Sequence, residues 1–169
     1  MPLALAVIDI DRFKSVNDDH GHDVGDVILK GVAARIREAV EGKGRAYRYG
    51  GEEIVAILPN MTLEEALPVA ERIRSSVETT RFESLLRAIT VSIGLAAFPQ
   101  HGGDPQALFR AADQALFSAL WRLCYAAIRT STLTLCIPRN APSPSHMSSC
   151  FFPGCVRLPL GCGLHPHFL

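Results

Sequence analysis

The sequence predicts an α+β domain of two layers, in which helices flank a mainly antiparallel central sheet. Three observations support this fold class. Residues 3–8 form an unbroken apolar run that is typical of a buried strand. The pair Gly50-Gly51 separates two strand-like segments, which indicates a β-hairpin. Apolar residues recur at helical spacing through residues 23–41, and a chain of 169 residues is long enough for one compact domain.

The first half of the chain is expected to form a strand, helical segments and a hairpin. Residues 12–20 are expected to form a short helix or turn, and residues 23–41 a helix that two following glycines end. Hairpin strands follow at residues 45–49 and 52–58. Glycine at both tip positions can adopt positive φ without a Cβ clash, and it leaves no side chain in the way of a ligand.

The second half is expected to add a helix, a strand and a last helix. Thr62 and Glu65 have the spacing of a capping box, which predicts that a helix begins after Thr62. Pro68 falls inside this helix, where a proline can introduce a kink. Residues 88–97 alternate in the manner of a strand, and Asp104 begins the last helix.

Four acidic residues lie next to expected strand ends. Asp9 and Asp11 follow the apolar first strand and share one face, because side chains two residues apart point the same way. Glu52 and Glu53 directly follow the glycine pair. If the first strand pairs beside the hairpin, the four carboxylates come together, and a hard cation such as Mg²⁺ would offset their repulsion. The alternative is that the first two are strand-end turn residues and the other two belong to a solvated hairpin tip.

These motifs resemble those of the GGDEF domains, a family of diguanylate cyclases. The resemblance covers about residues 3–117, and the motifs stand in the family's order. The motifs are Gly50-Gly51-Glu52-Glu53-Ile54, Asp9-Ile10-Asp11-Arg12-Phe13-Lys14 with Asn17-Asp18, Gly21-His22 and Gly25-Asp26 downstream, Thr90-Val91-Ser92-Ile93-Gly94, and Ala111-Ala112-Asp113-Gln114-Ala115-Leu116. The resemblance implies the palm-like fold of nucleotidyl cyclases.

The resemblance also implies an activity and a metal. Diguanylate cyclases join two GTP molecules into cyclic di-GMP and release pyrophosphate, as homodimers and with Mg²⁺ or Mn²⁺. Asp9 and Glu52 match the family's metal-binding carboxylates, and the carbonyl of Ile10 matches a further ligand. Glu53 matches the acidic residue that assists the 3′-hydroxyl or binds the second metal ion. Asp9, Glu52 and Glu53 are therefore the expected catalytic residues.

The residues expected to bind GTP follow from the same resemblance. Lys14 matches a phosphate-contacting lysine, and Asn17 and Asp26 match the residues that read guanine. A carboxylate suits guanine, because N1–H and N2–H₂ are neighbouring donors, and it would repel N1 of adenine. Outside the motif these three residues would be a solvated lysine, a turn residue and a helix-terminal acid. The remaining site residues are two glycines that offer bare backbone to the phosphates and two charged residues that support the site, namely Gly50, Gly51, Asp11 and Arg48.

Two departures from the family's pattern concern regulation and phosphate binding. Family members often carry an Arg-x-x-Asp product-inhibition motif five residues before the glycine pair, where this chain has Glu41-Gly42-Lys43-Gly44. The family's last helix usually continues with a lysine and an arginine that grip the phosphates, and Leu120 and Cys124 stand at those positions. We therefore expect no high-affinity product binding and low activity.

The chain divides into two parts of different composition. All 17 acidic residues lie at or before Asp113, whereas all five cysteines follow it, at spacings that match no common zinc site. We interpret residues 1–117 as a truncated GGDEF domain and residues 118–169 as a frameshifted or disordered tail. The first helix and the upstream sensor domain that the resemblance implies are missing from this chain.

Composition also limits the partners and the location. A formal net charge of zero argues against a basic nucleic-acid-binding surface. The apolar run at residues 133–137 is too short to span a bilayer, and no cationic signal-peptide start precedes the first strand. We therefore expect a cytoplasmic protein without a membrane segment. Two other function classes stay open: a non-catalytic GGDEF-like module that binds GTP or a protein, and a cyclase that closes one nucleotide on itself.

Overall fold

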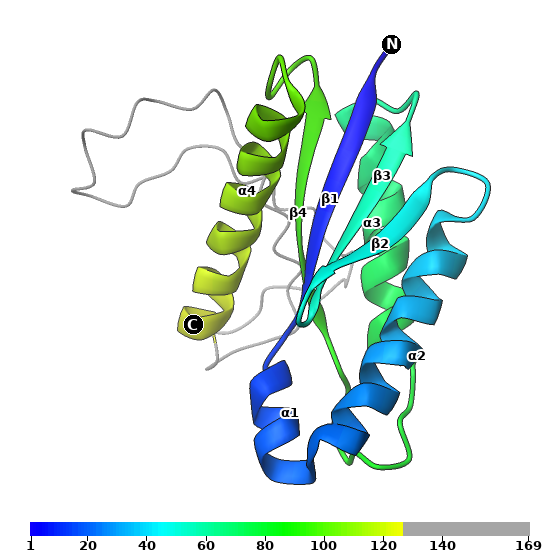
Figure 1. The fold of residues 1–169 in the computed structure, drawn as a ribbon, viewed down its shortest axis with the longest axis vertical. Helices are drawn as coiled ribbons and strands as arrows, with labels where there is room; N and C mark the ends of the chain where they lie inside the picture. The colour runs from blue at the N-terminus through cyan, green and yellow to red at the C-terminus, as the bar shows by residue number, and fades with distance from the viewer. Residues whose placement is uncertain (127–169) are drawn as a thin grey trace, which may run out of the picture.

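The computed structural model describes the backbone of residues 1–126 and the side chains of residues 1–119. Strands and helices follow one another along this part of the chain as shown in Figure 1. They are β1 (Leu3–Ile10), α1 (Phe13–His20), α2 (His22–Val40), β2 (Arg45–Gly50), β3 (Glu53–Pro59), α3 (Leu63–Thr79), β4 (Val91–Phe98) and α4 (Pro105–Ala126). The expected boundary after residue 117 falls inside α4, so the division into domain and tail stays a prediction, and residues 127–169 lie outside the described residues.

The strands form one antiparallel sheet in the order β2-β3-β1-β4. The central strand β1 pairs with β3 on one side and with β4 on the other. Since both faces of β1 are covered, its apolar run does not alternate with polar residues. The predicted fold class, α+β with an antiparallel sheet and flanking helices, is confirmed.

Helices cover both faces of the sheet, α2 and α3 on one face and α4 on the other (Figure 1). The described domain therefore has three layers, whereas the sequence predicts two. Even-numbered residues of β1, such as Ala6 and Ile8, pack with α2 and α3 in the larger hydrophobic core. Odd-numbered residues, such as Leu5 and Val7, pack with α4 on the opposite face. Each fully buried Val, Leu or Ile side chain stabilises the fold by about 1.5–3 kcal/mol relative to exposure. Among the helices of residues 1–126, none is long and apolar enough to cross a membrane.

The strand β4 is buried on both faces because α4 lies directly on it. A Cβ atom at Gly94 would collide with the backbone of Ala112 and Leu116, so only glycine permits this approach. The sequence predicts an alternating strand over residues 88–97, whereas the observed strand begins at Val91 and is buried in its first seven positions. The alternation is absent because the second layer of helix covers the outer face.

Local signals at the helix starts are confirmed. Thr62 Oγ1 accepts a hydrogen bond from the Glu65 backbone N–H at 3.3 Å, and Glu65 Oε2 accepts one from the Thr62 N–H at 2.8 Å. The helix α3 then continues through Pro68 without interruption. Asp104 Oδ1 accepts a hydrogen bond from the Ala107 N–H at 2.8 Å, as expected for a residue that begins a helix.

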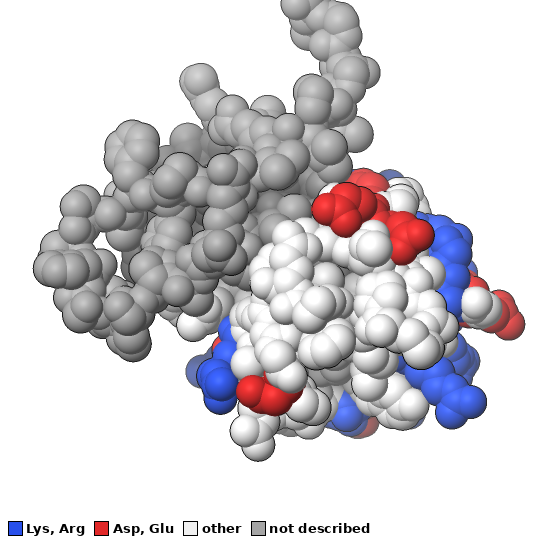
Figure 2. Space-filling view, turned by 90° about the horizontal axis from the view of Figure 1, so that it is seen from above, with Lys and Arg blue, Asp and Glu red and all other residues white. Residues whose placement is uncertain are grey.

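The two ends of the sheet differ in charge. The strand β1 begins at the upper end of Figure 1 and leads into α1 at the lower end. Seen from above, the upper end presents a broad uncharged surface with charged residues toward its rim (Figure 2). A hollow of about 470 Å³ at this end is lined mainly by apolar residues, among them Leu3, Ile57, Phe98 and Leu108. The acidic residues that the motifs single out lie at the other end, where β1 finishes.

Candidate active site

The ends of β1 and β3 set two predicted catalytic residues opposite each other. In the antiparallel register Asp9 pairs with Glu53, so their Cβ atoms lie about 4.5–5.5 Å apart on one face of the sheet. Glu52 immediately precedes Glu53 in the turn of the hairpin. On its other side Asp9 lies opposite Ser92 of β4. The structure therefore brings Asp9, Glu52 and Glu53 together at the lower end of the sheet.

Electrostatic repulsion links these carboxylates. The pKa of Asp9 is raised from 3.8 to about 7, first by burial and then by the charges of Glu52, Asp11 and Glu53. A divalent cation would offset this repulsion and keep the carboxylates ionised, so the donor set fits a hard, oxygen-ligated metal. Within the described part of the chain, however, no three Asp, Glu, His or Cys side chains are already arranged as a metal-binding group. The carboxylates are neighbours that do not yet form a closed ligand set.

The turn between β2 and β3 is held by Arg48. Its Nε and Nη2 atoms both donate to the carbonyl oxygen of Gly51, at 3.0 Å and 2.8 Å. Glycine can take positive φ at both tip positions, but neither Gly50 nor Gly51 has a φ in the left-handed region. A Cβ atom at Gly51 would meet no heavy atom within 4 Å. The glycine at this position therefore leaves open space beside the carboxylates, and backbone conformation does not require it.

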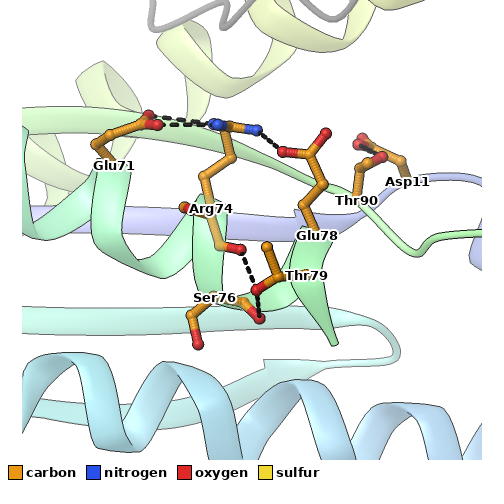
Figure 3. Close-up of polar contacts among 8 residues, drawn as sticks. Asp11, Glu71, Arg74, Ser76, Glu78, Thr79 and Thr90 are labelled. Atoms are coloured by element: carbon orange, nitrogen blue, oxygen red, sulfur yellow. Dashed lines mark hydrogen bonds and ion pairs between the residues drawn. The ribbon is translucent and has the colours of Figure 1, made fainter. Parts of the chain in front are cut away.

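Asp11 lies just beyond β1 and is bound to β4. Its Oδ2 accepts a hydrogen bond from Thr90 Oγ1 at 2.6 Å (Figure 3), and its Oδ1 accepts one from Ser92 Oγ at 2.7 Å. Sequence reasoning did not single out Thr90 or Ser92 as site residues. One signal was present, since two hydroxyl residues separated by one position share a strand face. Which carboxylate they reach depends on a strand pairing across 79 and 81 residues.

The residues predicted to bind GTP lie on the two helices that follow β1. Lys14 and Asn17 belong to α1, and Asp26 belongs to α2. The side chains of Lys14 and Asp26 are exposed, whereas Asn17 is half-buried against Gly25 of α2. Among the described residues, none of these three side chains has a hydrogen-bond or ion-pair partner. None of them is bound to the clustered carboxylates either. With respect to this part of the chain, their polar atoms are therefore free to meet a ligand.

Comparison with known proteins identifies the family. The family model for the GGDEF domain of diguanylate cyclases matches residues 1–121, so the chain belongs to the GGDEF domain family. Response regulator PleD from Caulobacter vibrioides is 40% identical over 122 residues, which cover 70% of this chain and 27% of PleD. Diguanylate cyclase DosC from Escherichia coli strain K12 is 40% identical over 121 residues, which cover 70% of this chain and 26% of DosC. The chain thus spans only a part of the length of these relatives.

A solved structure supports the same assignment. The active GGEEF domain of a diguanylate cyclase from Vibrio cholerae matches with a TM-score of 0.68 and 33% identity, over 72% of this chain and 78% of that one. The arrangement of sheet and helices is therefore that of the family.

Proposed function

We propose that this domain is a diguanylate cyclase, which condenses two GTP molecules into cyclic di-GMP and two pyrophosphates. The observation that carries the proposal is the register that sets Asp9 opposite Glu53, with Glu52 and an open glycine turn beside them. Carboxylates and accessible backbone thus lie at one place on rigid strands. Phosphoryl chemistry depends mainly on such positioning and on charge stabilisation.

The reaction consists of two equivalent transfers. The 3′-hydroxyl oxygen of each GTP attacks the α-phosphorus of the other, and a phosphodiester bond forms. The bond from the α-phosphorus to the oxygen bridging to the β-phosphate breaks, and pyrophosphate leaves with the electron pair. The hydroxyl proton passes to a base, and Glu53 is our candidate because it shares a sheet face with Asp9 at the open turn.

The metal that we propose for the site is Mg²⁺ or Mn²⁺. Asp9 and Glu52 would supply carboxylate oxygens, Ile10 its backbone carbonyl, and Glu53 a ligand to a second ion. When bound, the ions neutralise the triphosphate and lower the pKa of the attacking hydroxyl. The partly buried carboxylate of Asp9, surrounded by like charges, is the observation that supports a cation here.

The nucleotide would lie between the carboxylates and the two helices. Lys14, which is exposed on α1, would contact the phosphates, and bare backbone at Gly50 and Gly51 would lie alongside them. Asn17 and Asp26 would read guanine through its neighbouring N1–H and N2–H₂ donors. The free polar atoms of Asn17 and Asp26 support this assignment.

The stoichiometry of the reaction bears on assembly and location. Because each GTP attacks the other, we propose that two copies of the domain meet as a homodimer, each holding one nucleotide. Use of the cellular GTP pool makes the cytoplasm the location that we propose.

Product analysis tests the proposed function. The purified chain is incubated with GTP and Mg²⁺, and the products are separated by chromatography and identified by mass spectrometry. Cyclic di-GMP with pyrophosphate is the expected result, and Glu52→Ala should reduce its formation about 100-fold or more. A matched control is Glu64→Ala, because Glu64 is an exposed carboxylate in the first turn of α3. A cyclic mononucleotide would instead identify a single-nucleotide cyclase, and GTP binding without any product a non-catalytic module.

A further inference from the structure

Two hydroxyl groups, one just before β4 and one within it, bind both carboxylate oxygens of Asp11. Thr90 Oγ1 donates to Oδ2 at 2.6 Å and Ser92 Oγ donates to Oδ1 at 2.7 Å. Both distances lie within the range of O–H···O bonds to a carboxylate. Ser92 is only 4% exposed and is the buried polar residue of the described part of the chain. Asp11 is therefore held from the side of β4, away from the hairpin turn.

A backbone hydrogen bond fixes the neighbouring peptide. The Asp11 N–H donates to the carbonyl oxygen of Thr90 at 3.0 Å, which extends the contact between β1 and β4 by one residue. In a planar trans peptide the N–H and the C=O point in opposite directions. Since the Asp11 N–H points to β4, the carbonyl of Ile10 points to the side of β3. The β1–β3 register ends at Asp9 and Glu53, so Ile10 has no partner residue on β3.

The same contacts give the two aspartates, Asp9 and Asp11, different hydrogen-bond partners. Each hydroxyl has one proton to donate, and the protons of Thr90 and Ser92 go to Asp11. Ser92 lies opposite Asp9 in the register, yet its proton is not directed to that carboxylate. Asp9 consequently keeps its oxygens for a cation, while both oxygens of Asp11 are already engaged.

From this geometry we propose that Thr90 and Ser92 are positioning residues of the metal site. They hold the carboxylate of Asp11 next to the peptide whose carbonyl, that of Ile10, points to the proposed cation site. Because their protons go to Asp11, the carboxylate of Asp9 stays free to bind the divalent cation. The inference rests on the proposed function only in taking that place to be a metal site. Loss of the two hydroxyls removes both hydrogen bonds of the Asp11 carboxylate, so this carboxylate can rotate towards Asp9 and the Ile10 carbonyl while the backbone bond to Thr90 remains. The displaced carboxylate weakens metal binding, although no metal ligand is removed.

The test measures binding of Mn²⁺ alone, by the electron paramagnetic resonance signal of the free ion, on the full chain without nucleotide. Thr90→Val and Ser92→Ala should each weaken Mn²⁺ binding about tenfold, the lower end of what loss of an outer hydrogen-bond partner costs a metal site. Thr90→Ser keeps the hydroxyl and should restore the affinity to within about twofold of the wild type. In the cyclase assay the same variants should need more Mg²⁺ for half-maximal rate and should recover at saturating Mg²⁺.

The matched control is Thr79→Val. Thr79 Oγ1 lies near the end of α3 and donates to the carbonyl oxygen of Ser75 at 2.8 Å, with that of Ser76 at 3.3 Å (Figure 3). This variant therefore also loses a hydroxyl hydrogen bond, but one that does not involve Asp11. The proposal is overturned if the wild type binds no Mn²⁺, if Thr90→Val and Ser92→Ala bind it as the wild type does, or if Thr79→Val loses as much affinity. A wild type that binds Mn²⁺ and forms no cyclic di-GMP would contradict the proposed function and leave this test intact. If Ser92→Ala fails to fold, the comparison of Thr90→Val with Thr90→Ser decides.

Discussion

Gly25 of α2 lies directly against the side chain of Asn17 on α1. A Cβ atom at position 25 would collide with Oδ1 of Asn17, and it would lie 3.0 Å from its Cγ and 3.4 Å from Cζ of Phe13. Gly25 is buried inside a helix, where glycine is less stable than alanine by about 1 kcal/mol. The contact therefore gives a reason for glycine here, because only glycine leaves Asn17 in its observed place.

The first prediction concerns this contact. Gly25→Ala should weaken binding of Mg²⁺–GTP about tenfold, because Asn17 must move to relieve an overpacked contact of 1–3 kcal/mol. Calorimetric titration measures the affinity. In an Asn17→Ala background, Gly25→Ala displaces no side-chain oxygen. The losses of GTP affinity caused by the two substitutions should therefore not add.

A second glycine of α2 supplies the control for Gly25→Ala. A Cβ atom at Gly31 would collide with the ring of Phe82, so Gly31→Ala also overpacks α2 but leaves Asn17 untouched. It should lower the free energy of unfolding and preserve the GTP affinity of the folded protein. Full additivity of Gly25→Ala with Asn17→Ala would show that Gly25 does not act through Asn17.

The second prediction concerns base choice. Asp26→Ser should reduce the preference for GTP over ATP by about 1–3 kcal/mol, because guanine N1–H and N2–H₂ lose their paired acceptor. Competition between the two nucleotides, measured in the presence of Mg²⁺, gives the preference. Asp23→Ser is the matched control, since Asp23 is an exposed acid in the first turn of α2, three residues before Asp26. An Asp26→Ser variant with undiminished preference would mean that guanine is read by other residues.

Several features of the fold could be predicted because their signals are local. The capping box of Thr62 and Glu65 needs only residues three apart, and the hairpin needs only its own glycine pair. The convergence of Asp9 with Glu53 could also be predicted, because both residues stand at strand ends whose strands pair. The capping box and the hairpin required no knowledge of how distant segments pack, whereas the convergence of Asp9 with Glu53 required only that the first strand pair beside the hairpin.

Other features depend on packing that the sequence does not display. The register of β2 and β3 shifts between Arg48 and Gly50, so the turn differs from a simple two-residue hairpin and its glycines do not take positive φ. The hydrogen bonds of Asp11 to Thr90 and Ser92 join residues far apart in the chain. A motif predicts which residues matter, whereas these contacts decide how each side chain is held.

The third prediction concerns pH and the metal-free protein. The pKa of Asp9 is about 7 in the folded state against the ordinary value of 3.8, so the folded state binds the proton more tightly. The contribution of Asp9 protonation to the free energy of unfolding is fully present below about pH 3.8 and is lost as the pH rises through about 7. Asp9→Asn should therefore unfold less easily than the wild type at pH 8 in the presence of a chelator. The difference should be about 1–2 kcal/mol after discounting for solvent exposure of the carboxylate.

Urea unfolding at pH 5 and pH 8, with and without Mg²⁺, measures the effect of Asp9. The advantage of Asp9→Asn should shrink at pH 5, where the wild-type carboxyl is largely protonated, and also at pH 8 with Mg²⁺, which offsets the repulsion. A wild-type protein whose stability relative to Asp9→Asn did not change with pH would contradict the proposed crowding of carboxylates.

The last prediction concerns product binding between α2 and β2. Gly42, Lys43, Gly44 and Arg45 border a hollow of about 400 Å³ there, but no arginine or aspartate stands at the two ends of the inhibition motif. Lysine is a point charge and does not replace the bidentate grip of an arginine. We expect no saturable binding of cyclic di-GMP in the micromolar range when it is titrated by calorimetry.

The structure also predicts that the Arg-x-x-Asp motif can be restored at position 41 but not at position 44 without loss of stability. Glu41 is exposed, so Glu41→Arg should leave the free energy of unfolding unchanged. A Cβ atom at Gly44 would collide with the carbonyl oxygen of Ile57 and lie 2.9 Å from Cδ2 of Leu58, so Gly44→Asp should destabilise the fold by about 1–3 kcal/mol or more. The backbone of β3 is part of the sheet and cannot yield as a flexible side chain would. Tight binding of cyclic di-GMP to the wild type that Glu41→Ala abolished, or a Gly44→Asp variant of undiminished stability, would contradict this account.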